Sequence, residues 1–438
     1  MPRIKLLACL LTFIIISCDS DKVELANEEP KIDLGKEIIS IDIPENFMRE
    51  DQNLHIVLFD SYGEILDTKP SSNLKETLTF YTKNEFSDET QFSLAFISSS
   101  DHDIFGLNIY HNVTIKSLNG KIELKPRGYS KSTPSLKIDA LDLDNSLVLN
   151  AKGHGYSMVN INNRLSGHYT DDFNENLGPN NILIKYFDPH SVLNDSYKWL
   201  LTDNISTLSK LEVSSFSHEH VEYHQLSTNR PTETPLLDFL GFENETLFNK
   251  VSGHQLYGSD IPPFGFGGNH YYSFPNIFYK TAYSISFSDY SLFNVGIPPS
   301  SIEVPNLNID SSYLDGKLTF SGVAGYEVGR IMLDNYNNRI NIRLIFDGTS
   351  NEVLMPKIPT GILPDNITSI INNGQLRLVQ TIAEDYASFS NYNEYLFKVL
   401  KTSTPFYINS PKRERVYKPQ GTSHILPSSE YPYYVRFR

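Results

Sequence analysis

The chain has 438 residues, of which 39% are hydrophobic and 20% are charged, and 52 acidic side chains against 37 basic ones give a net charge of −15. This is the composition of a globular protein with room for two or three domains. The excess of negative charge repels phosphate groups, so we expect no nucleic-acid partner and little attraction to anionic lipid head groups.

The first segment of the chain has the composition of a leader peptide. Residues 1–5, "MPRIK", are positively charged, and residues 6–16 form an apolar run of eleven residues. A helix of that length spans about half of the ~30 Å hydrocarbon core of a bilayer. The run therefore predicts the core of a signal peptide rather than a transmembrane helix. The two cysteines of the chain, Cys9 and Cys18, both lie in or next to this leader.

Cys18 stands where the apolar run ends, and Ile15, Ile16 and Ser17 precede it. This pattern resembles the lipobox of bacterial lipoproteins, in which an aliphatic residue and two smaller ones precede a modified cysteine. The resemblance implies that residues 1–17 are cleaved off and that Cys18 carries diacylglycerol, often with a further acyl chain such as palmitate on its amino group. Two or three acyl chains suffice for stable membrane anchoring. The alternative is a plain secretory leader that happens to contain a cysteine.

Residues 18–34 read as an acidic tether, in which Asp19 and Asp21 follow the cysteine directly. The stretch "CDSDK" resembles the short acidic export signal of surface-exposed lipoproteins of the Bacteroidota. That resemblance implies a lipid anchor in the outer membrane with the protein facing outward. In enterobacterial sorting, an acid at this position instead implies retention in the inner membrane.

Residues 35–127 predict a β-sandwich, of immunoglobulin-like or transthyretin-like topology. Ile39, Ile41 and Ile43 alternate with polar residues, which is typical of a half-buried strand. "LHIVLFDSYGEILDT", residues 54–68, predicts a hairpin with its turn at residues 61–63. Further short strands are expected at 76–82, 91–98, 107–115 and 121–125, which gives the number that a small sandwich needs.

Residues 128–135 read as a linker, after which we expect β-rich regions at 136–305 and 306–438, as one domain or two. Residues 147–161 and 180–188 predict strands, and residues 329–359 predict a three-stranded meander with turns at "NYNN" and "DGTS". Helix is scarce; the best candidate is 390–401, with Ser390 as its cap. Residues from Tyr434 onward predict a terminal strand. The expected fold class is mainly β with one or two short helices.

The densest group of possible metal ligands is "SHEHVEYHQ", residues 217–225. As a strand, it would place His218, His220, Glu222 and His224 on one face, because side chains alternate. His218, His220 and Glu222 are therefore candidate metal ligands. The simpler interpretation is an exposed polar strand or loop, and we expect no other cofactor.

Three further motifs lack what their chemistry needs. "GHGYSMV", residues 153–159, has Val159 where a nucleophile elbow needs its second glycine. "PPFGFGGNH", residues 262–270, lacks the spacing of a phosphate loop and is interpreted as a flexible turn. "DALDLDN", residues 139–145, has Leu147 where a calcium loop of the EF-hand type needs glycine.

Aromatic residues are dense between Phe264 and Phe293, with eleven in thirty residues. Exposed rings could stack on sugars or anchor a protein partner, which makes Tyr271, Tyr272 and Phe274 candidate ligand-binding residues. The alternative is that these rings fill the core of a β protein.

Together these patterns favour a lipid-anchored surface protein that binds a glycan or a surface-protein partner without catalysis. Two alternatives remain open from the sequence. One is a fimbrial or pilus subunit, and the other is a metal-dependent hydrolase built on residues 218–224.

Overall fold

The computed structural model describes residues 34–45, 47–48, 51–72, 74–125, 136–140, 148–154, 156–161, 164–169, 181–188, 196–203, 210–249, 252–258, 264–266 and 269–419. The chain divides into two compact units, Met1–Leu34 and Gly35–Arg438, and every element below belongs to the second. Cys18, Asp19 and Asp21 lie outside the described residues, as do most of the "DALDLDN" motif and the predicted strand from Tyr434.

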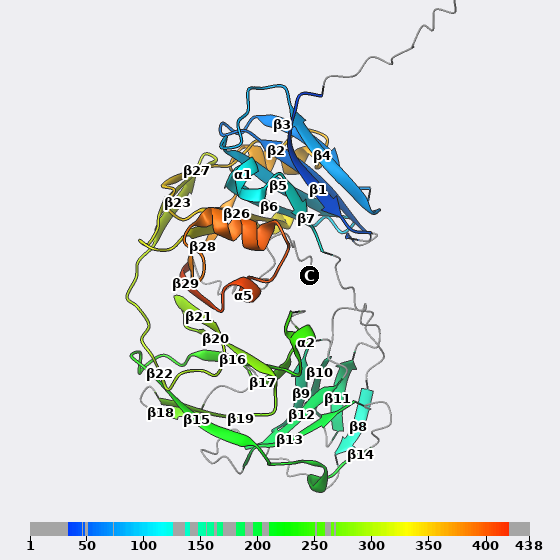
Figure 1. The fold of residues 1–438 in the computed structure, drawn as a ribbon, viewed down its shortest axis with the longest axis vertical. Coiled ribbons are helices and arrows are strands. Elements are labelled where there is room, and N and C mark those ends of the chain that lie inside the picture. The colour runs from blue at the N-terminus through cyan, green and yellow to red at the C-terminus, as the bar shows by residue number, and fades with distance from the viewer. Residues whose placement is uncertain are drawn as a thin grey trace, which may run out of the picture. The chain divides into compact units, whose positions relative to one another are not determined.

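The second unit is mainly β, which confirms the predicted fold class (Figure 1). Its N-terminal part is a sandwich of two sheets. In the first sheet, β1 (Lys36–Ile43) pairs antiparallel with β4 (Glu76–Thr82) and parallel with β7 (Lys121–Glu123). The second sheet has the antiparallel order β3 (Ile65–Pro70), β2 (Gln52–Phe59), β5 (Phe92–Ser100) and β6 (Phe105–Val113). Ile41, Ile56 and Phe96 meet in the core between the two sheets.

Local turns of the sandwich follow the chemistry of the sequence. In the β2–β3 turn, Asp60 Oδ1 accepts hydrogen bonds of 2.9 Å from the backbone N–H groups of Tyr62 and Glu64. Strand β6 ends at Val113, earlier than predicted, because Thr114 begins a short helix, α1 (Ile115–Leu118). The Thr114 and Ser117 side chains each accept from the other residue's backbone N–H, which forms a capping box.

The second sheet of the sandwich does not stop at the predicted linker. Strand β6 pairs in parallel with β26 (Ile340–Asp347), and antiparallel pairing continues from there. The order after β26 is β25 (Val328–Asn335), β28 (Arg377–Tyr386), β29 (Lys412–Pro419), β21 (Tyr290–Val295), β20 (Lys280–Ser286), β16 (Leu236–Phe242) and β17 (His254–Tyr257). The predicted boundaries at 127 and 305 therefore do not separate independent sheets.

Strand β17 joins a further set of strands through a single ladder pair, His254 with Gly153. This set has the order β14 (Lys210–Leu211), β8 (Leu136–Ala140), β11 (Arg164–Tyr169), β10 (Tyr156–Asn160), β9 (Val148–Gly153), β12 (Ile182–Phe187) and β13 (Lys198–Thr202). We name these strands the 136–211 sheet. Gly153 and Tyr156 lie on paired strands β9 and β10, so the described residues of the "GHGYSMV" motif do not form the strand-to-helix turn of a nucleophile elbow.

The remaining described strands form two smaller sheets. One has the order β18 (Phe264–Phe266), β19 (Asn269–Pro275), β15 (Val221–Thr228) and β22 (Ser301–Ile302). The other has the order β23 (Asp310–Leu314), β24 (Lys317–Ser321) and β27 (Glu352–Leu354). The predicted meander at 329–359 is thus wrong in its third strand. Strands β25 and β26 form a hairpin, but β27 pairs with β24 because β6 occupies the other edge of β26.

The predicted helix at 390–401 is confirmed as α4 (Tyr392–Tyr395) followed by a π-helix, η5 (Leu396–Leu400). Its cap is Asn391, whose Oδ1 accepts from Glu394 N at 3.1 Å, whereas the Ser390 hydroxyl donates to the Glu394 carboxylate. Other short helices were not predicted: α2 (Glu245–Asn249), α3 (Asp365–Asn372), α5 (Phe406–Asn409) and the 3₁₀ turns η3 (Val213–Ser215) and η4 (Tyr336–Asn338). Among the described residues, no helix has the length and apolar character needed to cross a membrane.

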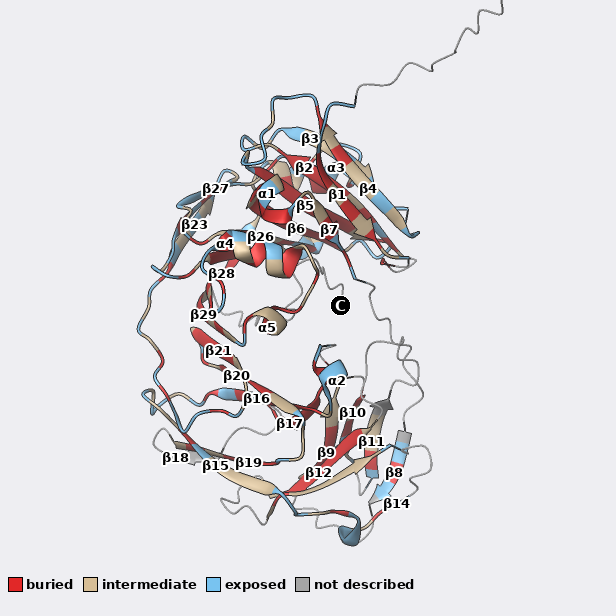
Figure 2. Cartoon of the chain, viewed as in Figure 1, coloured by how far each residue is buried: buried red, intermediate tan, exposed pale blue. Residues whose placement is uncertain are grey.

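The buried residues form three apolar clusters, and Figure 2 shows them concentrated along strands such as β5, β6 and β12. One buried charge cluster sits beside the second of these cores. Glu384 is fully buried and accepts from Arg330 Nη2 at 2.9 Å, Arg415 Nε at 2.6 Å and the Tyr386 hydroxyl at 2.8 Å. Burial alone would raise the pKa of Glu384, but the charges of Arg330 and Arg415 outweigh it and hold that pKa far below its ordinary value.

Candidate functional site

The predicted metal ligands do not share a strand face. Strand β15 begins only at Val221, and His220 lies in the preceding turn with a left-handed φ of +58°. That turn breaks the alternation on which the prediction rested, so His218 and His220 are not aligned with Glu222. Among the described residues, no three His, Cys, Asp or Glu side chains are grouped so that they could hold a metal ion.

Glu222 and His224 do share one face of β15 and bind each other. His224 Nε2 lies 2.9 Å from Glu222 Oε2, and the Asn276 amide donates to the other carboxylate oxygen at 2.5 Å. These hydrogen bonds lower the pKa of Glu222. Each oxygen of the Glu222 carboxylate therefore already takes part in one hydrogen bond within the protein.

Two of the three predicted ligand-binding aromatics belong to the core. Tyr272 and Phe274 on β19 are 2% and 0% exposed and pack in the largest apolar cluster, so their rings cannot receive a ligand. The core interpretation is therefore the right one for these two residues. Tyr271 points to the other face of β19 and is half-buried, with its ring stacked on Tyr223 at a centroid distance of 5.7 Å.

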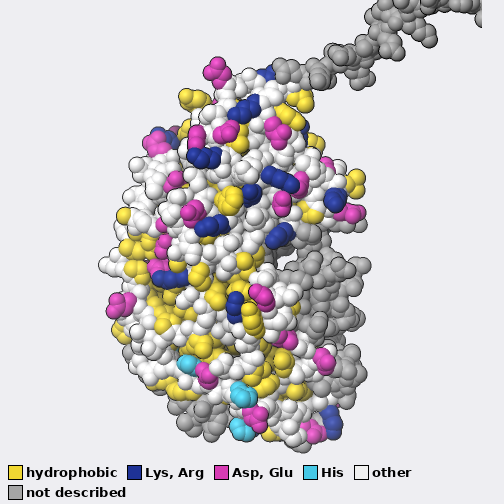
Figure 3. Space-filling view, in the orientation of Figure 1, with side chains coloured by type: hydrophobic (Ala, Val, Ile, Leu, Met, Phe, Trp, Pro, Cys, Tyr) yellow, Lys and Arg dark blue, Asp and Glu magenta, His cyan; other side chains and the backbone are white. Residues whose placement is uncertain are grey.

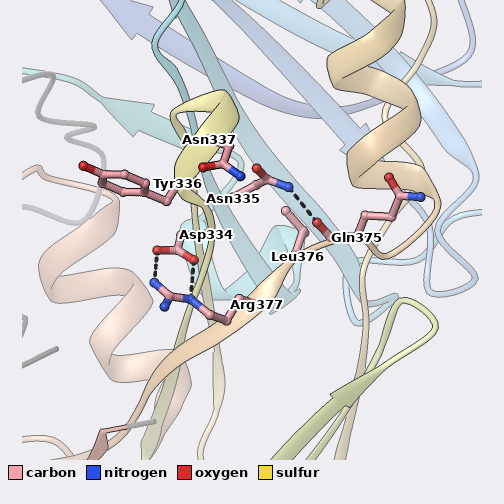
Figure 4. Close-up of a pocket in the computed structure, with 7 residues that line it drawn as sticks. All are labelled: Asp334, Asn335, Tyr336, Asn337, Gln375, Leu376 and Arg377. Carbon is pink, nitrogen blue, oxygen red and sulfur yellow. Dashed lines mark hydrogen bonds and ion pairs between the residues drawn. The ribbon is translucent and has the colours of Figure 1, made fainter. Parts of the chain in front are cut away.

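A pocket lined mainly by residues with polar groups lies elsewhere, where β25 ends and β28 begins (Figure 4). We name it the Tyr336 pocket. Its walls come from the end of β25, the η4 turn and the segment that leads from α3 into β28. The lining residues are Asp334, Asn335, Tyr336, Asn337, Gln375, Leu376 and Arg377.

The ion pair of Asp334 and Arg377 fixes one side of the pocket. The two residues are direct cross-strand partners, and the guanidinium donates in a fork, Nε to Oδ1 at 3.0 Å and Nη2 to Oδ2 at 2.8 Å. Asp334 is 8% exposed, whereas the Arg377 side chain is 59% exposed. The carboxylate raises the pKa of Arg377 and holds its guanidinium in place. Nη1 of Arg377 makes no hydrogen bond to any described residue and remains available to a ligand.

Asn335 fixes the turn that carries Tyr336. Its Oδ1 accepts from the backbone N and the side-chain Nδ2 of Asn338, at 3.3 and 2.9 Å, and its Nδ2 donates to the Gln375 carbonyl at 3.0 Å. Asn335 thereby caps η4 and ties it to the opposite wall. Figure 4 shows this contact and the Asp334–Arg377 pair as dashed lines.

The wall that contributes Gln375 is held by α3 and the β23–β24 turn. The Asn372 side chain accepts from Ile358 N at 2.8 Å and donates to Ile358 O at 2.9 Å. Gly374 has φ +68°, and a Cβ there would lie 3.0 Å from Gly316 N. Only glycine combines that backbone conformation with so close an approach.

The groups that remain open in the pocket are polar, aromatic and, at Leu376, aliphatic. Tyr336 is 85% exposed, and the exposed amides of Asn337 and Gln375 make no side-chain hydrogen bond within the described part of the chain. Leu376 is half-buried and supplies an apolar patch. An aromatic face, two amides that both donate and accept, and one guanidinium edge suit a ligand with an apolar ring face and several hydroxyl groups.

The sequence patterns missed this pocket. "NYNN" predicts only a turn, which η4 confirms. A tyrosine set among three asparagines was a usable signal, because a turn exposes its side chains. The opposite wall follows some forty residues later, and no local pattern reveals the pairing of Asp334 with Arg377.

No protein-family model and no curated protein matches this chain. Among solved structures, a crystal structure of a "putative adhesin" from Bacteroides ovatus is similar at 9% identity and a TM-score of 0.17, over 46% of this chain and 98% of the other. A TM-score of that size supports no conclusion about this chain.

Proposed function

We propose that the protein is a lipid-anchored, non-catalytic glycan-binding protein of the cell surface, and that the Tyr336 pocket holds one sugar ring of the glycan. The observation that carries this proposal is that Tyr336 is 85% exposed beside Asn335 and Arg377, whose side chains are fixed by hydrogen bonds. Exposing an aromatic ring to water is energetically unfavourable. A bound pyranose would cover the ring and remove that cost.

The charges of the pocket favour a neutral sugar. Arg377 is the cation among the lining residues, and the Asp334 carboxylate already neutralises it. On the face that Figure 3 shows, Lys and Arg side chains are interspersed with Asp and Glu. The ligand class we assign is a neutral, hydroxyl-rich saccharide.

Binding is tested with the purified chain from residue 19 onward on an array of neutral and acidic glycans. We expect binding to neutral saccharides that persists at high salt, because salt does not screen hydrogen bonds to hydroxyl groups or ring stacking. If no glycan on the array binds, and the chain instead captures one defined surface protein, the ligand is a protein.

Surface anchoring rests on the leader and on Cys18, and it needs its own experiment. Cells that express the full chain are fed an alkyne-tagged fatty acid, and surface exposure is followed by protease treatment of intact cells. We expect label on the wild type and none on Cys18→Ser. The variant with Ala in place of Asp19 and Asp21 should still carry the fatty-acid label. It should no longer be cleaved by protease added to intact cells. Label on Cys18→Ser would contradict the anchor.

A further inference from the structure

A second surface with aromatic and amide side chains lies on the outer face of β15 and β19. Leu226 on β15 and Tyr272 and Phe274 on β19 are at most 2% exposed, and they pack in the largest apolar cluster. Because side chains alternate along a strand, the residues between them point the other way. We name these the Tyr223–Tyr271 face: Tyr223, Gln225 and Ser227 on β15, with Asn269, Tyr271 and Ser273 on β19. None of the six lines the Tyr336 pocket.

The register of the two strands brings these side chains together. Tyr223 lies opposite Ser273, and Gln225 lies opposite Tyr271. Two diagonal contacts then join the pairs, as neighbours across antiparallel strands allow. The Tyr223 and Tyr271 rings stack at an interplanar angle of 12° and a centroid distance of 5.7 Å, and Gln225 Nε2 donates to Asn269 Oδ1 at 2.9 Å. The side chains of the face therefore fix one another.

The face keeps several hydrogen-bonding groups open. The hydroxyl groups of Tyr223, Tyr271 and Ser273 make no hydrogen bond to any residue that the structure describes, and neither do Gln225 Oε1 and Asn269 Nδ2. Gln225 is exposed, both tyrosines are half-buried, and β15 has intermediate exposure along most of its length (Figure 2). A ligand on this face can therefore meet three hydroxyl groups, one carbonyl oxygen and one amide N–H.

No side chain of the Tyr223–Tyr271 face carries a charge, although 20% of the residues in the chain do. The strand neighbours that can ionise point to the opposite face: His224 stacks on the buried ring of Tyr272, and His270 is 4% exposed. The face has no cation for an anionic ligand and no aliphatic or Arg anchor for a protein partner. Aromatic rings beside hydroxyl and amide groups instead match a neutral saccharide, which has apolar C–H faces and hydroxyl edges.

We propose that the Tyr223–Tyr271 face binds a neutral polysaccharide chain. The site is one side of a sheet, so each sugar makes few contacts and several consecutive units are needed for measurable affinity. A short saccharide should therefore occupy the Tyr336 pocket alone, whereas a polymer should bind at this face as well. The ligand class follows from the side chains of the face itself, so the proposal does not depend on the Tyr336 pocket.

Affinity electrophoresis of the purified chain from residue 19 onward tests this proposal. The gels contain a soluble β-glucan, mannan or galactan, or the acidic polygalacturonate for comparison. We expect at least one neutral polymer to slow the wild type and polygalacturonate not to, because the excess of acidic side chains repels it. The double variant with Tyr223→Ala and Tyr271→Ala should bind the neutral polymer at least tenfold more weakly.

Tyr279→Ala is the matched control, because Tyr279 is 50% exposed and lies outside both surfaces, and it should bind as the wild type does. Tyr336→Ala separates the two sites, since the polymer should still slow it. If a thermal melt shows that the double variant does not fold, Gln225→Ala gives a second test and should weaken binding about threefold, as the loss of one hydrogen bond implies.

Three results would overturn the proposal. One is that no neutral polymer slows the wild type. Another is that the variants at Tyr223, Tyr271 and Gln225 are slowed as much as the wild type. The third is that Tyr336→Ala is no longer slowed at all, because the polymer would then bind only at the Tyr336 pocket. Binding of short saccharides to the Tyr336 pocket is measured separately by calorimetry, so failure of either site is recognised without the other.

Discussion

At the scale of single residues, the Tyr336 pocket depends on side chains whose partners fix them. Asp334 is buried and has no other role in the pocket than to hold Arg377, whereas Asn335 is occupied by the turn and the opposite wall. Tyr336, Asn337 and Gln375 are left to meet a ligand. Substitution of Asp334 or Asn335 should affect binding by changing the geometry of the pocket. Substitution of Tyr336, Asn337 or Gln375 should affect it by removing a contact with the ligand.

Arg377→Lys keeps the positive charge but removes the planar fork that pairs with Asp334. We expect glycan affinity to fall roughly tenfold, because the ammonium cannot reproduce both hydrogen bonds and still present a donor to the ligand. The unfolding midpoint should change little, since the Arg377 side chain is 59% exposed. Calorimetric titration and a thermal melt measure the two effects, and unchanged affinity would remove Arg377 from the site.

Glu384→Gln tests the buried charge cluster. The substitution leaves Arg330 and Arg415 without the carboxylate that they share, so we expect a loss of about 3–5 kcal/mol in the free energy of unfolding. Glu352→Gln is the matched control, because its ion pair with Lys317 is exposed and should matter by less than about 1 kcal/mol. Urea denaturation measures the free energy of unfolding of both variants. An equal loss in the two would show that the buried carboxylate of Glu384 matters no more than an exposed one.

At the scale of elements, period-two patterns and turn chemistry were enough to predict β1, the β2–β3 hairpin, β4 and the helix after Asn391. They failed where a single residue departs from the regular conformation, as His220 does before β15. They also failed where strands distant in sequence pair, because the edge of β26 is taken by β6 and not by β27. The pocket also depends on pairing between distant strands, because Asp334 on β25 lies opposite Arg377 on β28. Only the wall formed by "NYNN" could therefore be predicted from the sequence.

Gly374→Ala tests whether the α3–β28 connection shapes the pocket. The added Cβ meets Gly316 N at 3.0 Å, and alanine at φ +68° is strained, so we expect a loss of about 1–2 kcal/mol in stability together with weaker glycan binding. Gly325→Ala is the control, because Gly325 has φ +87° with no atom within 4 Å of an added Cβ. It should lose stability by strain alone and keep full binding, and weaker binding in both variants would contradict a specific role for Gly374.

At the scale of the whole molecule, stability should depend on pH through carboxylates shifted in opposite directions. The lowered pKa of Glu384 means that its contribution is present above the unfolded pKa of about 4.3 and is lost as the pH falls below it. Burial, with Asp385 nearby, raises the pKa of Glu327 to about 7. The contribution of Glu327 is therefore present below about pH 4.3 and is lost as the pH rises through 7.

The unfolding temperature should accordingly fall between pH 5.5 and pH 8. Glu327→Gln should flatten that fall, because the amide cannot ionise, and should melt above the wild type at pH 8. Differential scanning calorimetry across this range measures both curves. A wild-type melting temperature that is flat from pH 5.5 to pH 8, or a variant with the same slope, would show that Glu327 does not control this part of the profile.

Calorimetric titration of matched variants tests whether the Tyr336 pocket binds a neutral glycan. The ligand is the strongest neutral saccharide found on the array, and the proteins are the wild type, Tyr336→Ala and Tyr62→Ala. Tyr62 is the control because it is 82% exposed in a different turn. We predict that Tyr336→Ala weakens binding at least tenfold, or about 1.4 kcal/mol, with no change in melting temperature, while Tyr62→Ala binds as the wild type does. Equal affinity of Tyr336→Ala and the wild type would contradict the claim.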